Sequence, residues 1–271
     1  MIPIALTVAG SDSSGGAGIQ ADLKTFSALG VYGASVLTAL TAQNTRGVQA
    51  IHDVPADFVG AQLDSVFGDL AVRATKIGML SRPETIRAVA DGLARHRAAS
   101  VVLDPVMVAT SGDRLITEDA VASLRTLLLP LCECLTPNLP EAAILLGEPI
   151  APDEEAMAAQ GRRLLAFGAG AVLMKGGHAD GPESVDVLVE RDRTTRLAAR
   201  RVATANTHGT GCTLSAAVVA GRAGGLALLA ATEAAKAYLG GAIASADRLS
   251  IGGGRGPVHH FHALWPSARE A

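Results

Sequence analysis

Short apolar runs alternate with longer amphipathic segments along most of the chain. Residues 4–9 are continuously apolar and end at a glycine, a pattern typical of a parallel strand buried on both faces. Residues 19–29 carry apolar side chains on one side at helical spacing and polar side chains on the other. The alternation predicts further strands at residues 32–40, 48–52, 75–80, 101–103, 171–175, 185–189 and 196–202, further helices at 55–67, 81–95, 118–129, 153–167, 213–220 and 226–248, and turns at 111–113 and 180–182.

Strands that alternate with helices predict an α/β fold, in which helices cover both faces of a central, mostly parallel β-sheet. No repeat, low-complexity segment or linker divides the chain, so we expect residues 1–271 to form a single domain. The first apolar run has no basic segment before it, so it is expected to be a strand rather than a signal peptide. No uncharged apolar run reaches the about 20 residues that span a bilayer, so we expect a cytoplasmic protein without a membrane partner.

Two helix starts carry hydrogen-bonding signals. Ser81 and Glu84 have the S-x-x-E spacing of a capping box, in which each side chain bonds the other residue's backbone N–H. Asn138 and Glu141 have the same spacing, with a proline inside the first turn of the helix that follows. Both pairs are therefore expected to begin helices.

The composition narrows the classes of partner. Aromatic residues make up only 3% of the chain, which disfavours a nucleic-acid site built on base stacking. The net charge is −3 and no long run of lysine and arginine occurs, so a binder of the phosphate backbone is disfavoured as well. The three cysteines are an odd number, which fits a reducing compartment better than a disulfide scaffold. Cys132 and Cys134 lie in an apolar run and are expected to be core thiols.

Residues 206–212, Asn-Thr-His-Gly-Thr-Gly-Cys, join a β-leaning run to a helix of small residues. The two glycines let the backbone turn tightly and leave its N–H groups uncovered. The first turn of a helix has unpaired donors and a partial positive charge, so this segment is a candidate anion site. Cys212 lies where that field is strongest, and such a position can lower the pKa of a thiol from about 8.5 towards about 3.5–7.5. The alternative is a glycine-rich loop that caps a helix, with Cys212 a small buried residue.

Four other polar clusters stand at the ends of predicted strands: residues 10–18, Asp104, Asn138 with Glu141, and Lys175. Ligands of open α/β sheets bind outside the carboxyl ends of the strands, so we expect these clusters to converge with residues 209–212. Asn138 and Glu141 offer oxygen ligands for Mg²⁺ and its waters, as an alternative to capping. Asp104 is either a turn residue or faces a metal or phosphate, and Lys175 can meet a phosphate. An anion site, a Mg²⁺ site and a basic residue are the groups that phosphoryl-transfer enzymes use.

Gln43 is among the polar residues that follow the predicted strand 32–40. Its side chain offers one acceptor and two donors, which suits a planar, aminopyrimidine-like edge. The alternative for Gln43 is an exposed loop amide.

Two nucleotide motifs are excluded. Gly16, Gly18 and Ala21 match the Rossmann glycine pattern, but residues 23–52 contain no acidic side chain to hold a ribose hydroxyl. No G-x-x-x-x-G-K-[ST] sequence occurs, so a P-loop site is excluded too.

Three of the seven histidines, His259, His260 and His262, lie near the end of the chain. The adjacent pair cannot share one face of a regular element, and no acidic residue is near in the sequence. A packing or interface role is therefore favoured over a metal site.

The combined motifs resemble a known family. Residues 206–212 are a variant of the D-T-x-G-[AT]-G-D signature of ribokinase-like kinases, and Asn138 with Glu141 matches the N-x-x-E motif of that superfamily. Residues 9–22, Ala-Gly-Ser-Asp-Ser-Ser-Gly-Gly-Ala-Gly-Ile-Gln-Ala-Asp, make the resemblance closer. Further matches at 75–80, 136–141, 174–178 and 256–263 extend it nearly end to end. The chain resembles the bacterial hydroxymethylpyrimidine/phosphomethylpyrimidine kinases of thiamine biosynthesis.

The resemblance implies a ribokinase-like fold, ATP and Mg²⁺ as cofactors, and a homodimer. It implies that 4-amino-5-hydroxymethyl-2-methylpyrimidine is phosphorylated twice, to the monophosphate and then to the diphosphate. The site residues that it implies are Gln43, Gly10, Asp22, Met79 and Val106 at the pyrimidine; Asp104, Asn138, Glu141, Lys175 and Thr207 at ATP; Asn138, Glu141 and Asp104 at Mg²⁺, directly or through water; and Gly209, Thr210, Gly211, Cys212 and Lys175 at the reacting phosphoryl group.

One departure from the wider superfamily suggests a mechanism. In that superfamily the signature begins with an aspartate and ends with an aspartate base. Here the segment begins with Asn206, and it ends with a cysteine, Cys212, as in the pyrimidine kinases. The first phosphorylation acts on a hydroxymethyl group, which must lose a proton. The second acts on a phosphate oxygen that is already ionised near neutral pH. We therefore hypothesise that Cys212 serves as a base in the first step only.

Three alternatives remain open at this point. A pyridoxal kinase has the same fold and chemistry, and pyridoxal also carries a hydroxymethyl group on a heteroaromatic ring. A thiol hydrolase or acyltransferase would use Cys212 with His208, but it leaves Asn138, Glu141 and Lys175 without a task. A non-catalytic binder of the pyrimidine is the third.

Overall fold

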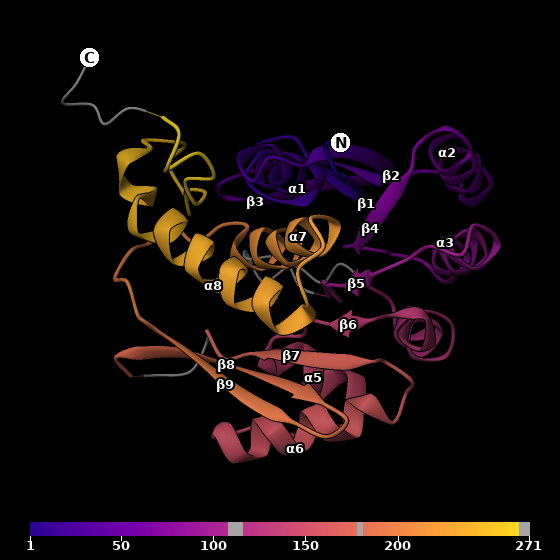
Figure 1. The fold of residues 1–271 in the computed structure, drawn as a ribbon. Coiled ribbons are helices and arrows are strands. Elements are labelled where there is room, and N and C mark those ends of the chain that lie inside the picture. The colour runs from indigo at the N-terminus through magenta and orange to yellow at the C-terminus, as the bar shows by residue number, and fades with distance from the viewer. Residues whose placement is uncertain (108–115, 178–180, 266–271) are drawn as a thin grey trace.

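The computed structural model describes residues 1–107, 116–177 and 181–265 (Figure 1). In these residues the strands form one sheet of nine strands, in the order β3-β2-β1-β4-β5-β6-β7-β8-β9. The strands are β1 (Ile4–Asp12), β2 (Tyr32–Asn44), β3 (Gly47–Asp53), β4 (Val72–Ile77), β5 (Val101–Leu103), β6 (Cys134–Leu135), β7 (Ala171–Lys175), β8 (Glu183–Glu190) and β9 (Thr194–Arg200). The helices are α1 (Gly18–Ala28), α2 (Ala56–Asp69), α3 (Pro83–Arg95), α4 (Glu118–Ser123), α5 (Leu139–Leu146), α6 (Glu154–Leu165), α7 (Thr210–Ala223) and α8 (Leu228–Ala244).

The six strands from β2 to β7 in the sheet order run parallel, which confirms the predicted mostly parallel sheet. β3, β8 and β9 lie towards the two edges and run antiparallel to their sheet neighbours. Their connections explain this difference. Only residues 45–46 join β2 to β3, and only residues 191–193 join β8 to β9, whereas a parallel crossover needs about a dozen residues or more. The parallel strands therefore all end at one edge of the sheet.

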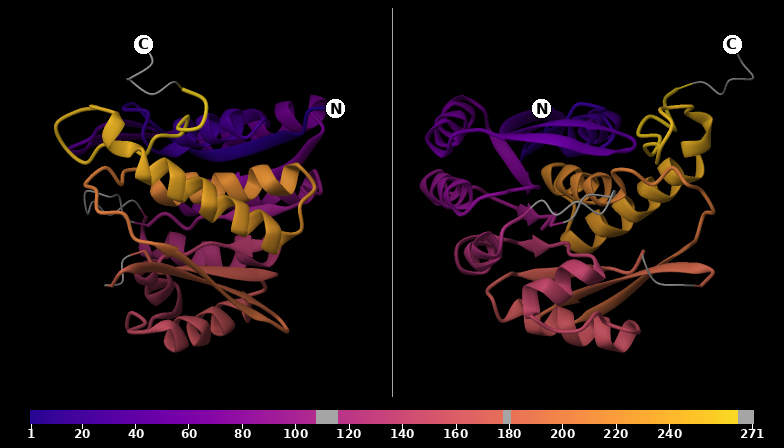
Figure 2. Two further views of the ribbon diagram at one scale, coloured as in Figure 1. Left: turned by 60° about the vertical axis from the view of Figure 1, so that its left-hand side comes forward. Right: turned by 180° about the vertical axis from the view of Figure 1, so that it is seen from behind.

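Helices cover both faces of the sheet, as predicted. α2, α3, α5 and α6 lie on one face, and α1, α7 and α8 lie on the other (Figures 1 and 2). Alternate residues of β1 serve the two cores, because Leu6 and Val8 pack on the first face and Ala5 on the second. On the second face the sheet and α7 both contribute small side chains, such as Ala5 and Ala216, so α7 can lie close to the strands. Among the described helices, none has the length and apolarity that crossing a membrane requires.

Two local predictions are wrong in detail. Ser81 does not cap α3, which begins after Arg82 without a side-chain cap. The Ser81 hydroxyl instead donates to Asp53 at the end of β3, so a tertiary hydrogen bond replaces the local one. The strand predicted at 32–40 continues to Asn44, because the antiparallel partner β3 pairs with its last residues.

The helix predicted at 118–129 is also divided. α4 is followed by a π-helical stretch, Leu124–Leu128, and by a 3₁₀ turn, Leu129–Leu131, that contains Pro130. Proline removes a backbone donor, so the helical stretch cannot continue past Pro130 as a regular α-helix. The turn predicted at 111–113 lies outside the described residues, as does residue 180, the first residue of the turn predicted at 180–182.

Most of the cysteines and histidines that the sequence assigns to packing are buried, while His262 is half-buried. Cys132 and Cys134 are core thiols, as predicted. His260 lies against α7, with Nε2 3.1 Å from the hydroxyl of Thr213. His259 packs edge-on against Trp265. In the described part of the chain, no group of three or more His, Cys, Asp or Glu side chains is arranged to hold a metal ion.

A buried ion pair joins α1 to β4. The Nζ atom of Lys76 lies 2.8 Å from a carboxylate oxygen of Asp22, and both side chains are fully buried. The hydroxyl of Thr7 donates to the same carboxylate at 2.6 Å. Burial opposes the charged ammonium group, but Asp22 outweighs it and raises the pKa of Lys76 above its ordinary value. Each partner therefore depends on the other to remain charged in the core.

Asp22→Asn is expected to lower the free energy of unfolding by about 3–5 kcal/mol, because it leaves the Lys76 charge buried without its partner. Urea denaturation measures this loss. The control, Asp91→Asn on the exposed side of α3, should change stability by less than about 0.5 kcal/mol. Adding Lys76→Met to Asp22→Asn should restore most of the loss. A single variant as stable as the starting protein would contradict the dependence.

Candidate active site

A cavity of about 600 Å³ lies at the carboxyl edge of the parallel strands. Members of all five polar clusters line it, which confirms the predicted convergence. Among the predicted site residues, all of them described, Asp22 alone does not line the cavity. Those that do are Gly10, Gln43, Met79, Asp104, Val106, Asn138, Glu141, Lys175, Thr207, Gly209, Thr210, Gly211 and Cys212.

Asp22 lies beneath the cavity instead of facing it. Its partner Lys76 does line the cavity, so the pair contributes through the lysine. Lys76 lines the cavity although no motif in the sequence indicates it as a site residue. The available signal was a lysine in the otherwise largely apolar run at 75–80.

An apolar wall and an amide form one side of the cavity. The wall consists of Gly10, Met79 and Val106, and Gln43 lies beside it on β2. A Cβ at Gly10 would lie 2.6 Å from the methyl carbon of Met79, so a side chain at this position would displace the end of the methionine. The amide oxygen of Gln43 lies 3.0 Å from the hydroxyl of Thr41, which orients the half-buried amide.

The opposite side begins at α7. Gly209 is the N-cap residue with φ +80°, a conformation that favours glycine. Residues 210–212 form the first helical turn, whose N–H groups have no partner within the helix. A Cβ at Gly211 would lie 3.3 Å from Nζ of Lys175, so the absence of a side chain brings this backbone next to a cation. The combination of N–H donors and an ammonium group can bind a phosphate.

Three charged side chains meet between α7 and α5. Nζ of Lys175 lies 2.7 Å from Asp104 and 3.8 Å from Glu141, and the two carboxylates are 1% and 6% exposed. Ser215 also donates to Asp104, at 3.0 Å. Burial disfavours the charged form of Asp104, but Lys175 and Lys76 outweigh it and lower the pKa of Asp104 below its ordinary value.

Glu141 responds differently to the same surroundings. Burial raises the pKa of Glu141 to about 7, because nearby Lys175 only partly compensates and Asp104 adds a like charge. Both carboxylates contact Lys175, and a further positive charge at this end of the cavity would favour the ionised form of Glu141.

Asn138 and Glu141 form the predicted capping box at the start of α5. The backbone N–H of Asn138 donates to Glu141 at 2.7 Å, and the backbone N–H of Glu141 donates to Oδ1 of Asn138 at 2.8 Å. The capping role is therefore confirmed. It also fixes both oxygen-bearing side chains at the edge of the cavity.

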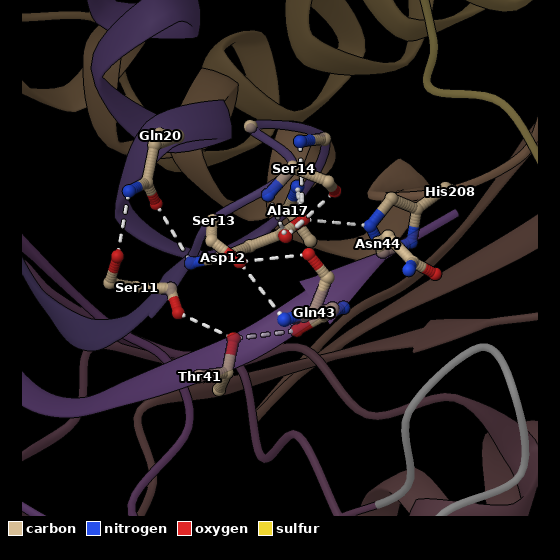
Figure 3. A network of polar contacts seen from close by, with 12 residues as sticks. Ser11, Asp12, Ser13, Ser14, Ala17, Gln20, Thr41, Gln43, Asn44 and His208 are labelled. Atoms are coloured by element: carbon tan, nitrogen blue, oxygen red, sulfur yellow. Dashed lines mark hydrogen bonds and ion pairs between the residues drawn. The ribbon is translucent and has the colours of Figure 1, made fainter. Parts of the chain in front are cut away.

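The predicted fall in the pKa of the Cys212 thiol is wrong. Cys212 is the third residue of α7 and is half-buried. Burial raises its pKa to about 11, because the loss of water outweighs the attraction of Lys76 and because Asp22 and Asp104 are negative. The thiol is therefore protonated at neutral pH. Its candidate partner in a hydrolase, His208, bonds Asp12 instead (Figure 3).

Comparison with known proteins agrees with this chemistry. The sequence model of one family, described as phosphomethylpyrimidine kinase, matches residues 12–259. A hydroxymethylpyrimidine/phosphomethylpyrimidine kinase from Rhizobium meliloti (strain 1021) is 63% identical over 98% of this chain and 99% of its own length. A thiamine biosynthesis bifunctional protein from Geobacter sulfurreducens is 52% identical over 95% of this chain and 52% of its own length. The structure of an ADP complex of Bacillus subtilis pyridoxal kinase has a TM-score of 0.91 at 35% identity and covers 98% of this chain and 100% of that one.

The fold and the cavity define a small-molecule kinase with the ribokinase-like fold. The parallel sheet brings Lys175 and Asp104 to one edge, and α7 adds the glycine-rich candidate anion site. The chain belongs to the phosphomethylpyrimidine kinase family.

The raised pKa of Glu141 predicts a pH-dependent stability. The folded-state pKa, about 7, lies above the ordinary value of 4.5. The proton bound to Glu141 therefore stabilises the folded state fully below about pH 4.5, and this stabilisation is lost as pH rises through 7. Glu141→Gln removes this titration and keeps the capping hydrogen bond. Its melting temperature relative to the unsubstituted protein should therefore rise between pH 5 and pH 8, on the order of 3 °C.

Differential scanning fluorimetry without nucleotide measures this difference. Glu84→Gln, at an exposed position in the first turn of α3, is the matched control and should show no such trend. A Glu141→Gln difference that stays constant with pH would contradict the buried, raised-pKa carboxyl group.

Proposed function

We propose that this protein transfers the γ-phosphoryl group of ATP to 4-amino-5-hydroxymethyl-2-methylpyrimidine, and then phosphorylates the resulting monophosphate to the diphosphate, in thiamine biosynthesis. One observation carries the proposal. A single cavity joins the amide of Gln43 to the anion site at 209–212 and to Lys175. The names of the relatives at 63% and 52% identity support the substrate and the pathway.

The two ends of the cavity suit the two substrates. At one end, the Gln43 amide would hydrogen-bond the amino edge of the pyrimidine, and Gly10, Met79 and Val106 would pack on the ring. At the other end, apolar side chains suit a flat nucleotide base; they include Leu239 and Ile243 of α8. ATP also agrees with the ADP complex of the structural relative.

The phosphoryl group would lie between these ends. The N–H groups of Gly209, Thr210, Gly211 and Cys212 would stabilise charge that develops on it. Lys175 would contact the same group as a point charge, held in place by Asp104. Thr207 would contact the nucleotide from the loop before α7. Binding both substrates in one orientation is the main contribution that this geometry makes to the rate.

The residues also fit a role for Mg²⁺. Asp104 and Glu141 are buried carboxylates that share one lysine, so a further cation would relieve their repulsion. The described residues offer too few ligands for an all-protein site, which suits Mg²⁺ because it keeps waters and binds through phosphates. Asp104, Glu141 and Asn138 would hold it mainly through water. When bound, Mg²⁺ neutralises phosphate charge.

We also propose a homodimer that works in the cytoplasm. β3 is an edge strand of the sheet, and Leu40, Ile51 and Phe58 are exposed near this edge. Exposed apolar edges tend to be covered by a partner. Sedimentation velocity would test the dimer.

The central experiment compares ATP turnover with the hydroxymethylpyrimidine, its monophosphate and pyridoxal. We expect turnover of the first two, with kcat/KM for the hydroxymethylpyrimidine at least about tenfold above that for pyridoxal, since pyridoxal lacks the amino group that Gln43 would bond. Gln43→Leu should narrow that preference. A preference for pyridoxal would favour the pyridoxal kinase alternative. This alternative is tested because the structure of the Bacillus subtilis pyridoxal kinase matches this fold with a TM-score of 0.91. Turnover of none of the three would contradict the proposal.

Cys212→Ala should slow the first phosphorylation more than the second. In the first step, a Cys212 thiolate would accept the hydroxyl proton while the oxygen bonds the γ-phosphorus and the bond to ADP breaks. A general base contributes about 10²–10⁴-fold, and the ionised phosphate acceptor of the second step does not need one.

Single-turnover rates of the two steps measure this difference. The pKa of Cys212 is about 11, so the thiolate fraction rises with pH. The first step should therefore accelerate relative to the second between pH 7 and 9. Equal losses in both steps for Cys212→Ala, or a ratio that does not change with pH, would sink the hypothesis.

A further inference from the structure

The loop after β1 and the loop before α7 meet through one side-chain contact (Figure 3). Nε2 of His208 lies 2.8 Å from Oδ2 of Asp12, although 196 residues separate them in the sequence. Both side chains are buried, at 7% and 3% exposure. His208 directly precedes Gly209, where the anion site begins. The proposed function has so far given no task to this pair.

Asp12 holds its own loop together. Oδ1 accepts hydrogen bonds from the backbone N–H and the hydroxyl of Ser14, at 2.8 and 2.7 Å. Oδ2 accepts from the N–H groups of Gly16 and Ala17, at 3.1 and 2.8 Å. Burial opposes its charge, but bonds from His208 and Ser14 outweigh burial and lower the pKa of Asp12 to about 2. An ionised carboxylate can only accept, so Nε2 of His208 carries the proton of the contact.

The two loops also touch through their backbones. A Cβ at Gly209 would overlap the carbonyl oxygen of Gly16, and a Cβ at Gly16 would overlap the ring of His208. The backbone N–H of His208 donates to Gly256 at 3.0 Å, so the C-terminal segment holds the same loop from its other side. Gly16 thus contacts both the His208 ring and Gly209. We therefore expect a shift of this ring to move Gly209 as well.

The loop held by Asp12 also contacts the pyrimidine side of the cavity. The Ser13 hydroxyl donates to the backbone carbonyl of Gln43 at 2.8 Å and accepts from the backbone N–H of Gln43 at 2.9 Å (Figure 3). Hydrogen bonds from Gln43 to Ser13 and from Asp12 to His208, joined by the peptide bond between residues 12 and 13, therefore connect the two sides.

We propose that Asp12 and His208 form a positioning pair, which fixes the N–H groups of residues 209–212 relative to the pyrimidine end of the cavity. The pair acts through the backbone that it holds. This inference rests on the proposed function, since it assigns the anion site to the transferred phosphoryl group. A displacement of about 1 Å in such a site can cost about 10²-fold in rate.

Two substitutions separate this role from a merely structural one. His208→Leu removes the donor to Asp12, whereas His208→Gln keeps an N–H donor at similar reach. His96→Leu is the matched control, because His96 makes the same kind of contact with Asp64, at 2.7 Å, far from the cavity. For His208→Leu we expect kcat to fall about 10²-fold, with KM for the pyrimidine changed less than about threefold. His208→Gln should recover most of kcat, and His96→Leu should leave kcat unchanged.

A binding measurement tests the pair without any pyrimidine. Isothermal titration with Mg²⁺ compares the affinities for AMP-PCP and ADP, which differ in the third phosphate. In His208→Leu the ratio of the two affinities should shrink by about threefold to tenfold, the range expected for one lost hydrogen bond. This readout stays valid if the unsubstituted protein phosphorylates none of the acceptors, in which case only the proposed function fails.

Three results would overturn the inference. They are a His208→Leu variant with kcat within about twofold of the unsubstituted protein, a His208→Gln variant as slow as His208→Leu, and an unchanged affinity ratio. Circular dichroism and melting temperature establish that each variant is folded. If His208→Leu does not fold, His208→Asn takes its place, because its shorter amide keeps a polar group but cannot reach Asp12.

Discussion

Neighbouring parallel strands end at the same edge of a sheet, and the chemistry of this protein depends on that constraint. β1, β5 and β7 end at Asp12, Leu103 and Lys175, which are far apart in the sequence. The residues at and just after these ends therefore meet around one cavity. α7 completes it, because the small side chains of α7 and of the strands beneath let this helix lie close to the sheet. The backbone of its first turn then lies next to Lys175, which the end of β7 supplies.

The buried charges of the cavity are arranged in pairs. Lys76 is held by Asp22 and Lys175 by Asp104, so each ammonium group stays charged and fixed in a region with little water. The main-chain donors in the first turn of α7 are instead unpaired within the helix. They are dipoles fixed before substrate arrives, which is the kind of group that stabilises developing charge without reorganisation. Burial, with a smaller contribution from Asp22 and Asp104, explains why Cys212 keeps its proton despite its place at a helix start.

Most of the fold follows from local patterns in the sequence. Continuous apolar runs predict the parallel strands except β6, which is only two residues long, and amphipathic spacing predicts α1, α3 and α6 closely, because burial on two faces or on one leaves a different periodicity. The edge strands were predicted as strands, but their antiparallel direction depends on connection length, which the pattern does not display directly. Ser81 was assigned to the wrong partner, because its hydrogen bond to Asp53 exists only in the folded chain.

The site residues also fall into those that local sequence predicts and those whose position depends on the folded chain. Gln43, Lys175 and the glycines of 209–212 could be named from motifs, because their residue types match a chemistry. Asp22 could not be placed correctly, since its burial under Lys76 depends on how α1 packs on β4. The contact between Asp12 and His208 joins residues 196 positions apart, and neither local periodicity nor motif spacing indicates such a pair.

A crystal structure with AMP-PCP, Mg²⁺ and the hydroxymethylpyrimidine would test the central claim most directly. The account predicts that the amino edge of the ring bonds Gln43, that the γ-phosphate faces the N–H groups of residues 209–212, and that the hydroxymethyl oxygen lies about 3–3.5 Å from the γ-phosphorus. A ring bound away from Gln43, or a γ-phosphate bound away from α7, would contradict it.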